Sequence, residues 1–356
     1  MKVYMHSTSA IDKDPRPKRI MDFLQGEKHQ VHDLQYIYSK RSKIIKFIMY
    51  IFWLISKRNY FLIKIISLQP SQRLDRNQVD YHLVEDPLIL PFLFDKMDES
   101  AKVVIDLREF HPRAQSNFVF YFTYRLIYTH IYRNYVTQAN YVLTVSEIHK
   151  NICEKKFRIK SEVVLSAPVY SHDKNNFIEK RKQKIDYVYL GLANTNRGMS
   201  LICDSFVKLK DSNLHLYLSG NVIYIEKLQA KYAKIKNIKI YRMVELTEVI
   251  TELRKYDVGI CFYKKPWNAK HALPNKFFSY IHSDLALLVY EKSQMGNLVN
   301  KHGIGKTIGK YSVRSFCEVV SNLTFDEVNR YRKQSNDLKA SICFQNEASV
   351  LRGIFK

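Results

Sequence analysis

The chain lacks the motifs that mark several large enzyme classes. It has ten glycines in 356 residues, none of which forms a GxGxxG fingerprint, and HExxH and nucleophile-elbow motifs are also absent. Dinucleotide oxidoreductases, zinc hydrolases and α/β-hydrolases therefore lose their main support. The five cysteines form no CxxC pair and no zinc spacing, which favours free, mostly buried thiols in a reducing cytoplasm. They are Cys153, Cys203, Cys261, Cys317 and Cys343.

Long hydrophobic runs are missing too. The apolar run Phe47–Ile55 is far shorter than the roughly 20 residues that a membrane-spanning helix needs. Residues Met1–His6 read as a short strand followed by polar loop residues, and this is not the layout of a signal peptide. The segment Gly303–Thr307 looks like the end of a P-loop, but the motif's first glycine would fall at Asn300 and no strand precedes it, so we exclude it.

Acidic residues are scarce relative to basic ones, with 34 Asp and Glu against 57 Lys and Arg and a formal charge of +23. Nucleic acid, an anionic membrane face and phosphorylated ligands are the usual partners of such a charge. Lysine, isoleucine, asparagine and tyrosine are all abundant, so part of the excess is compositional. Charge alone does not choose among these partners, but no nucleic-acid recognition module is visible, and we expect no nucleic-acid partner.

The hydrophobic pattern predicts an α/β fold with two Rossmann-like domains facing across a cleft. A chain of 356 residues exceeds the usual size of a single core. Short apolar runs alternate with helical stretches, which indicates parallel sheets. We predict strands at Val3–His6, Gln30–Leu34, Val103–Asp106, Tyr141–Val145, Glu162–Leu165, Ile185–Leu190, Leu214–Ser219, Ile238–Tyr241, Val258–Phe262 and Ala286–Val289.

A polar stretch between Ser171 and Lys184 is the best domain boundary. We therefore predict a first domain over residues 1–175 and a second over 176–330. The helices of residues 331–356 are expected to pack back toward the first domain. Ligands of such sheets bind at the carboxyl ends of the strands.

Two stretches combine aromatic and basic residues at high density, Arg41–Leu68 and Asn117–Val136. Their composition fits a helix lying in an anionic membrane surface, with aromatic side chains on one side and lysines on the other. A core helix wedged against the first sheet is the alternative, and it is the commoner source of such apolar runs. The sequence leaves both open.

The segment His271–Ile281 is the strongest candidate for ligand binding. Helical periodicity begins after Pro274, so Pro274 and Asn275 should stand at a helix N-terminus, where unpaired amides favour an anion. Lys276 adds a cation in the first turn, where the helix dipole disfavours it, and a bound phosphate would compensate it. A similar strand–loop–helix arrangement is predicted after the strand Ile185–Leu190, where Gly191 and Arg197 precede a helix. Arginine can bind phosphate through two hydrogen bonds. The alternative is a solvated arginine in an ordinary loop.

The order of these elements resembles the retaining glycosyltransferases of the GT-B fold, in particular the family 4 (group 1) enzymes of bacterial surface polysaccharide synthesis, over nearly the whole chain. The matching segments are Asp14–Arg19, Val104–Pro112, Asn140–Glu147, Tyr189–Gly198, Leu253–Ile260 and Leu273–Ile281. The last is similar to the family's "PNKxFEYxA" helix, which grips the nucleotide sugar.

The resemblance implies roles for individual residues. Arg197 and Lys276 would neutralise the donor diphosphate in place of a metal, so no metal or other cofactor is expected. Gly191, Pro274 and Asn275 would shape the donor site, and Met243 and Val244 would hold the base. On the acceptor side it implies Arg16, Arg108, Glu109 and His111, with Glu109 or His111 facing the acceptor hydroxyl or the transferred sugar; a structural Arg108–Glu109 role is the alternative.

Two departures from the family pattern stand in the donor segment. Glutamates are usual at positions 271 and 279, where this chain has His271 and Ser279. Serine can hydrogen-bond a ribose hydroxyl less strongly than a carboxylate. His271 would contact the sugar or a phosphate, or it is an exposed loop histidine.

We therefore expect a cytoplasmic glycosyltransferase, peripheral on the inner face of the plasma membrane. It would move a sugar from a nucleotide-diphosphate donor to a lipid-linked or glycan acceptor in capsule, O-antigen or exopolysaccharide synthesis. Retention of configuration follows from the resemblance alone. The alternative, slightly favoured by the missing glutamates, is a non-catalytic GT-B-like protein that binds membranes or partners in a polysaccharide assembly locus.

Overall fold

The computed structural model describes residues 1–39, 42–72, 79–115, 117–171, 177–180, 183–194, 197–263 and 267–356. Lys40 and Arg41 of the predicted basic flank, Thr195 and Asn196 of the loop before Arg197, and much of the predicted boundary segment lie outside them. The described chain divides into two compact units, residues 1–164 with 347–356, and residues 165–346. The first predicted boundary is at 175, whereas the first unit ends at residue 164. The second is at 330, whereas residues 331–346 also belong to the second unit.

The first unit contains a seven-stranded sheet in the order β3-β2-β1-β4-β5-β6-β7, in which only β3 runs antiparallel to its neighbour. Central strands are buried on both faces, as expected of a parallel sheet covered by helices. The strands are β1 (Lys2–Ser7), β2 (Gln30–Tyr38), β3 (Leu68–Pro70), β4 (Tyr81–Val84), β5 (Lys102–Leu107), β6 (Tyr141–Thr144) and β7 (Glu162–Val163).

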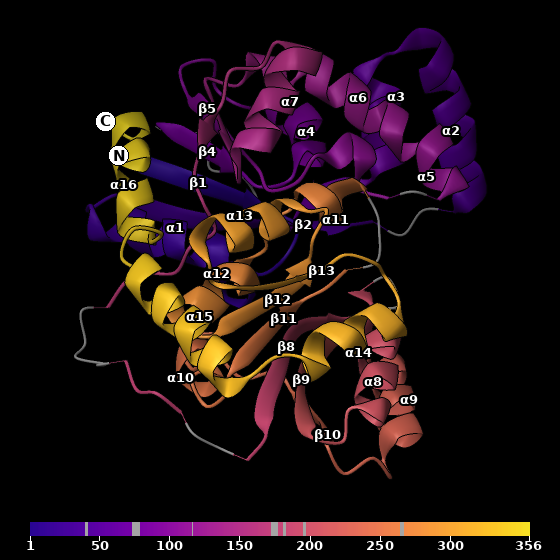
Figure 1. Ribbon diagram of the computed structural model, residues 1–356. Coiled ribbons are helices and arrows are strands. Elements are labelled where there is room, and N and C mark those ends of the chain that lie inside the picture. Colours follow the sequence, from indigo (N-terminus) through magenta and orange to yellow (C-terminus); the bar gives the residue numbers. More distant parts are fainter. Residues whose placement is uncertain are drawn as a thin grey trace. The chain divides into compact units, whose positions relative to one another are not determined.

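The helices of the first unit are α1 (Pro15–Gly26), α2 (Lys43–Ser56), α3 (Asn59–Ile66), α4 (Leu90–Phe94), α5 (Phe118–Phe122), α6 (Tyr124–Asn134), α7 (Glu147–Phe157) and α16 (Phe344–Ile354), whose residues from 347 onward belong to this unit. Tyr81 donates a hydrogen bond to the Ile354 carbonyl at 2.8 Å, which fixes the end of α16 to β4. At the other end of the unit, α2, α3 and α5 lie together (Figure 1).

The helix α2 lies on the surface of the first unit, so the alternative prediction of a core helix is wrong. Only Tyr50 and Trp53 of α2 are buried. Ile44 is 73% and Ile55 80% exposed, and Phe118 on the neighbouring α5 is 77% exposed. The Tyr50 hydroxyl donates to the Phe122 carbonyl and ties α2 to α5. The helices α2 and α5 thus form one exposed apolar face, while α3 and α6 bury part of their apolar side chains. Among the described residues no helix has the length and hydropathy to cross a bilayer.

The second unit contains a six-stranded parallel sheet in the order β10-β9-β8-β11-β12-β13. Its strands are β8 (Ile185–Ala193), β9 (Ser212–Gly220), β10 (Ile238–Arg242), β11 (Val258–Cys261), β12 (Ala286–Tyr290) and β13 (Gly305–Ile308). The first strand of the unit, β8, is central and pairs with β9 on one side and β11 on the other. This is the doubly wound order in which the chain reverses direction across the sheet between its first and fourth strands.

Helices cover both faces of the second sheet. One core cluster packs α8 (Met199–Lys208), α9 (Val222–Tyr232) and α14 (Val313–Ser321) against one face, and a second packs α10 (Val249–Leu253), α12 (Asn275–His282) and α13 (Gln294–His302) against the other (Figure 1). Two further helices, α11 (Trp267–His271) and α15 (Phe325–Leu338), complete the unit. The prediction of two parallel-sheet α/β domains is confirmed.

Candidate functional site

The candidate site lies where β8 and β11 end side by side in the second sheet. These strands pair directly, with Val258 opposite Tyr187 and Gly259 opposite Val188. They are the two strands between which the winding reverses, and ligands of such sheets bind outside the carboxyl ends of the strands at this point. The segments predicted to bind phosphate follow these two strands.

Lys276 is the central residue of this site. The helix α12 begins at Asn275 with Pro274 as its N-cap residue, which confirms the predicted start and places Lys276 in the first turn. The Lys276 side chain is buried, with the residue 6% exposed. Its ammonium nitrogen has no hydrogen-bond partner among the described residues. A buried cation without a carboxylate or carbonyl partner is costly, and an anionic ligand would relieve that cost.

Two tyrosine rings surround the Lys276 ammonium group. Its Nζ lies 3.5 Å from the ring centre of Tyr189 and 5.0 Å from that of Tyr263. Tyr189 belongs to β8, and Tyr263 follows β11. The negative faces of the rings attract the cation, so these strands supply part of the missing counter-charge.

Arg197 joins the same cluster. Its guanidinium lies 4.9 Å from the ring centre of Tyr263, so one ring contacts both cations. Burial lowers the pKa of Lys276 to about 7, and the positive charge of Arg197 acts in the same direction. The predicted pair is therefore brought together, and its mutual repulsion is a second reason why the site favours an anion.

Two glycines shape the backbone around the cations. Gly191 has φ +145°, and a Cβ atom built there would lie 3.6 Å from Lys276 Nζ. Gly198, directly after Arg197, has φ +75°, and its Cβ would lie 2.4 Å from the Tyr311 hydroxyl. A positive φ and this lack of space both require glycine at position 198. Arg197 is thus held by a turn that only glycine fits.

The N-terminus of α12 adds polar groups to the site. No side chain caps it, the Phe277 amide donates to the Pro274 carbonyl at 3.0 Å, and the partial positive charge of a helix N-terminus favours an anion there. The Ser279 hydroxyl donates to the Asn275 carbonyl at 3.1 Å and keeps its lone pairs for a further hydrogen bond. His271 ends the short helix α11, and its ring packs on Trp267 with centroids 4.4 Å apart. Its predicted alternative of a freely exposed loop residue is wrong, because it is partly buried against that indole.

Met243 and Val244 lie directly after β10 and are partly buried against one of the two core clusters. They follow the carboxyl end of β10, which is an outer strand of the second sheet. The other predicted donor-side residues also come from segments at the carboxyl ends of strands in this sheet. Their assignment to base binding stays a prediction.

On the first unit, Arg16 is buried in an ion pair, and its acceptor-side assignment stays a prediction. It is 2% exposed. Its Nε and Nη2 donate to the two carboxylate oxygens of Asp106 at 2.7 Å each, and its Nη1 donates to the Val164 carbonyl at 2.6 Å. All three nitrogens are therefore engaged in joining α1 to the ends of β5 and β7.

Arg108 is paired differently from the predicted structural alternative. Its guanidinium forms an ion pair with Asp14, the N-cap residue of α1, and a longer one with Glu85 at 3.7 Å. Glu109, in contrast, is exposed. Arg108 thus belongs to an Asp14–Arg108–Glu85 cluster, which supports a structural role for this residue.

Glu85 is a residue that the sequence reasoning missed. It follows β4, which pairs with β1, so it occupies in the first sheet the reversal point that the Lys276 site occupies in the second. It is 2% exposed, and neither carboxylate oxygen has a hydrogen-bond partner among the described residues. Burial raises its pKa to about 8, against the opposing effect of Arg108. A short strand ending in a lone glutamate was the only signal in the sequence.

His111 is buried among aromatic rings of α6. Its Nδ1 lies 3.1 Å from the Tyr132 hydroxyl, and its ring centre lies 5.2 Å from that of Tyr128. Glu109 and His111 thus have different environments, one exposed and one buried. The described residues contain no group of three or more His, Cys, Asp or Glu placed to hold a metal ion.

No known sequence family and no curated protein matches the chain, but its fold matches several solved structures. A sucrose-phosphate synthase from Thermosynechococcus elongatus superposes with TM-score 0.70 at 8% identity, covering 99% of this chain and 98% of its own. WaaG, a glycosyltransferase involved in lipopolysaccharide biosynthesis, gives 0.66 at 10% identity and covers 97% and 96%. S. aureus TarM, solved with UDP, gives 0.60 at 11% identity over 78% of this chain, which spans only 55% of TarM. The chain therefore has the GT-B fold that these proteins share.

Proposed function

We propose that the protein is a glycosyltransferase that moves a sugar from a nucleoside-diphosphate sugar to a lipid-linked or glycan acceptor. One observation carries the proposal: Lys276 and Arg197 meet at the reversal point of the second sheet, and the buried ammonium has no anionic partner among the described residues. A diphosphate has the charge and size to fill this role. Similarity to WaaG and to TarM, whose structure holds UDP, supports the same substrate class.

The chemistry follows from where negative charge develops. As the bond between sugar and diphosphate breaks, charge grows on the departing phosphate oxygens. Lys276, Arg197 and the positive end of the α12 dipole are fixed in advance around that position, and such preorganised charges stabilise a transition state without reorganising. Two cations and a helix terminus can serve in place of a metal ion, so we propose metal-independent transfer.

The remaining roles are proposed by analogy. Ser279 would accept or donate a hydrogen bond to the ribose, His271 would contact the donor sugar, and Met243 and Val244 would hold the base. Glu109 or His111 would face the acceptor hydroxyl or the transferred sugar. We propose retention of configuration, with the leaving diphosphate helping to take the acceptor proton, and a place in capsule, O-antigen or exopolysaccharide synthesis.

Peripheral binding to an anionic membrane is part of the proposal. The exposed apolar residues of α2 and α5 are bordered by cations such as Lys43, Lys46 and Lys57, which suits a helix face lying in a lipid headgroup region. A lipid-linked acceptor would be reached from such a position on the inner face of the plasma membrane.

The test measures binding and turnover of a panel of nucleotide sugars by the wild type, Arg197→Ala and Lys276→Ala. Each variant should lose about 100-fold or more in turnover, the usual effect of removing one preorganised charge-stabilising group. Lys301→Ala, an exposed lysine on α13, should behave as wild type. A wild type that binds no nucleotide or nucleotide sugar refutes the enzyme proposal. Binding without hydrolysis or transfer would favour the non-catalytic alternative, which the His271 and Ser279 departures support.

A further inference from the structure

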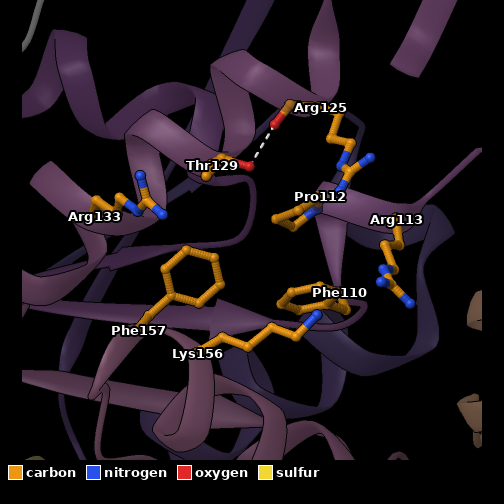
Figure 2. A pocket seen from close by; sticks show the side chains of 8 residues that line it. All are labelled: Phe110, Pro112, Arg113, Arg125, Thr129, Arg133, Lys156 and Phe157. Carbon is orange, nitrogen blue, oxygen red and sulfur yellow. Dashed lines mark hydrogen bonds between the residues drawn. The ribbon is translucent and has the colours of Figure 1, made fainter. Parts of the chain in front are cut away.

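A cationic pocket lies in the first unit, and none of its lining residues is assigned above to the donor. It has a volume of about 210 Å³ and is formed by α6, the end of α7 and the turn after β5 (Figure 2). Arg125 and Arg133 come from α6, Lys156 from α7, and Arg113 from the turn. None of the eight lining residues is acidic.

Three of the four cations of this pocket lack a carboxylate partner in the part of the chain that the structure describes. Arg125, Arg133 and Lys156 take part in no ion pair among the residues that the structure describes. Loss of solvation and the positive charges of Arg113 and Arg125 lower the pKa of Lys156. Four like charges around one cavity repel one another, so the arrangement gains stability when an anion enters.

The floor of the pocket is aromatic. Phe110 and Phe157 face the cavity with ring centres 6.1 Å apart, and Lys156 extends across it with its Nζ 5.6 Å from the Phe110 ring centre. The Thr129 hydroxyl is already used, since it donates to the Arg125 carbonyl at 2.7 Å. The pocket therefore offers cationic donors above an apolar surface, which matches a phosphate carrying an organic substituent.

The pocket borders the exposed apolar face of the unit. The Arg125 guanidinium lies 4.3 Å from the ring centre of Tyr121 on α5. Val119, on the same short helix, is 66% exposed. An amphiphile held by its phosphate in the pocket would have its apolar part beside α5.

We propose that this pocket binds a phosphate ester, with the phosphate among Arg113, Arg125, Arg133 and Lys156 and the organic part over Phe110 and Phe157. The ester can be the headgroup of an anionic lipid or a free phosphorylated metabolite, since both present the same group. The proposal does not depend on the transferase proposal, because the two sites share no residue.

The test uses the full chain and two kinds of probe. Calorimetric titration with glycerol 3-phosphate and with inorganic phosphate measures the free ester and the bare anion. Flotation with phosphatidylglycerol vesicles, against phosphatidylcholine vesicles, measures the lipid source. The pocket variant is Arg125→Gln with Lys156→Gln. Its control is Lys155→Gln with Lys160→Gln, which removes the same charge from exposed positions outside the pocket.

The pocket variant should bind glycerol 3-phosphate or the anionic vesicles about tenfold or more weakly, as expected when charged hydrogen-bond donors are lost. The control should stay within about twofold of wild type. If the double variant does not fold, the single variant Lys156→Gln, at an exposed position, should also bind the probes more weakly than wild type. Equal losses in both double variants, or no binding of any probe to the wild type, would overturn the proposal. UDP binding should be unchanged in the pocket variant, which shows that the loss of phosphate-ester binding does not come from damage to the donor site.

Discussion

The Lys276 ammonium nitrogen lies 3.5 Å from the ring centre of Tyr189, with no hydrogen-bond partner for that nitrogen among the described residues. A cation over an aromatic face gains about 2 kcal/mol when desolvated, which is less than the cost of taking a lone ammonium out of water. Without a ligand the site is therefore destabilising. Under the proposed function, a bound diphosphate would supply the counter-charge that offsets this cost.

Lys276→Met should stabilise the protein and abolish diphosphate binding. Methionine keeps the length of the side chain and removes the buried charge. The lowered pKa, about 7 against 10.5, corresponds to a gain on the order of a few kcal/mol at neutral pH. Urea denaturation gives the free energy of unfolding, and calorimetry with UDP gives the affinity. Lys301→Met should change neither, and a Lys276→Met protein that binds UDP normally would contradict the assignment.

UDP binding should weaken as the pH rises above about 7, the pKa of Lys276 without ligand. The anion binds the charged amine, so the bound state has a higher pKa and takes up a proton at pH 8. Phosphate esters have their last pKa near about 6, so UDP itself contributes little there. Titrations at pH 8 in buffers of different ionisation enthalpy count that proton, and an uptake of zero would refute the linkage.

The same amine makes the free protein more stable toward alkaline pH. Its folded pKa is depressed, so the unfolded chain binds more protons between about pH 7 and 10.5, and the free energy of unfolding rises across that interval. This contribution is lost as the pH falls from 10.5 to about 7. The rise should be absent in Lys276→Met, which serves as the control.

Glu85→Gln should remove a pH dependence of opposite sign. Burial raises the pKa of Glu85 from 4.5 to about 8, so the folded protein binds more protons in this interval. Its contribution to stability is complete below pH 4.5 and is lost as the pH rises to about 8. The variant should equal wild type near pH 5 and exceed it at pH 8 in chemical denaturation. An identical pH profile for both proteins would show that Glu85 is charged in the folded state.

Gly198→Ala should destabilise the protein and weaken UDP binding, because the turn that holds Arg197 has no room for a methyl group. Gly303→Ala is the matched control: Gly303 also has a positive φ, +61°, but nothing lies within 4 Å of its Cβ position. The control carries only the backbone cost, about 1 kcal/mol. Thermal denaturation should show a larger loss of stability for Gly198→Ala than for Gly303→Ala. Equal losses would mean that the Tyr311 side chain moves aside at no energetic cost.

The sequence predicted most of the parallel strands because their apolar runs are local signals, but it missed β4 and β13. The run Tyr81–Val84 contains a histidine, and His82 is buried in the sheet only because its Nδ1 pairs with the Nε2 of His6 at 2.8 Å. A partner so far away in sequence leaves no local pattern.

The site shows the same division between local and distant signals. The start of α12 was predictable from Pro274 alone, because proline restricts its own φ angle and is common at helix N-termini. The burial of Lys276 depends on Tyr189 and Tyr263, and the pairing of Arg16 depends on Asp106 and Val164, so neither was predictable from spacing. The sequence therefore predicted candidate side chains in the second unit, but it did not predict the residues that surround them.

The cost of burying Lys276 also has an evolutionary consequence. A descendant of this chain released from ligand binding would gain stability from almost any apolar replacement at position 276, so drift would remove the lysine early while the fold persisted. A lysine at this position, beside tyrosines equivalent to 189 and 263, therefore distinguishes relatives that still bind an anion from those that retain only the architecture.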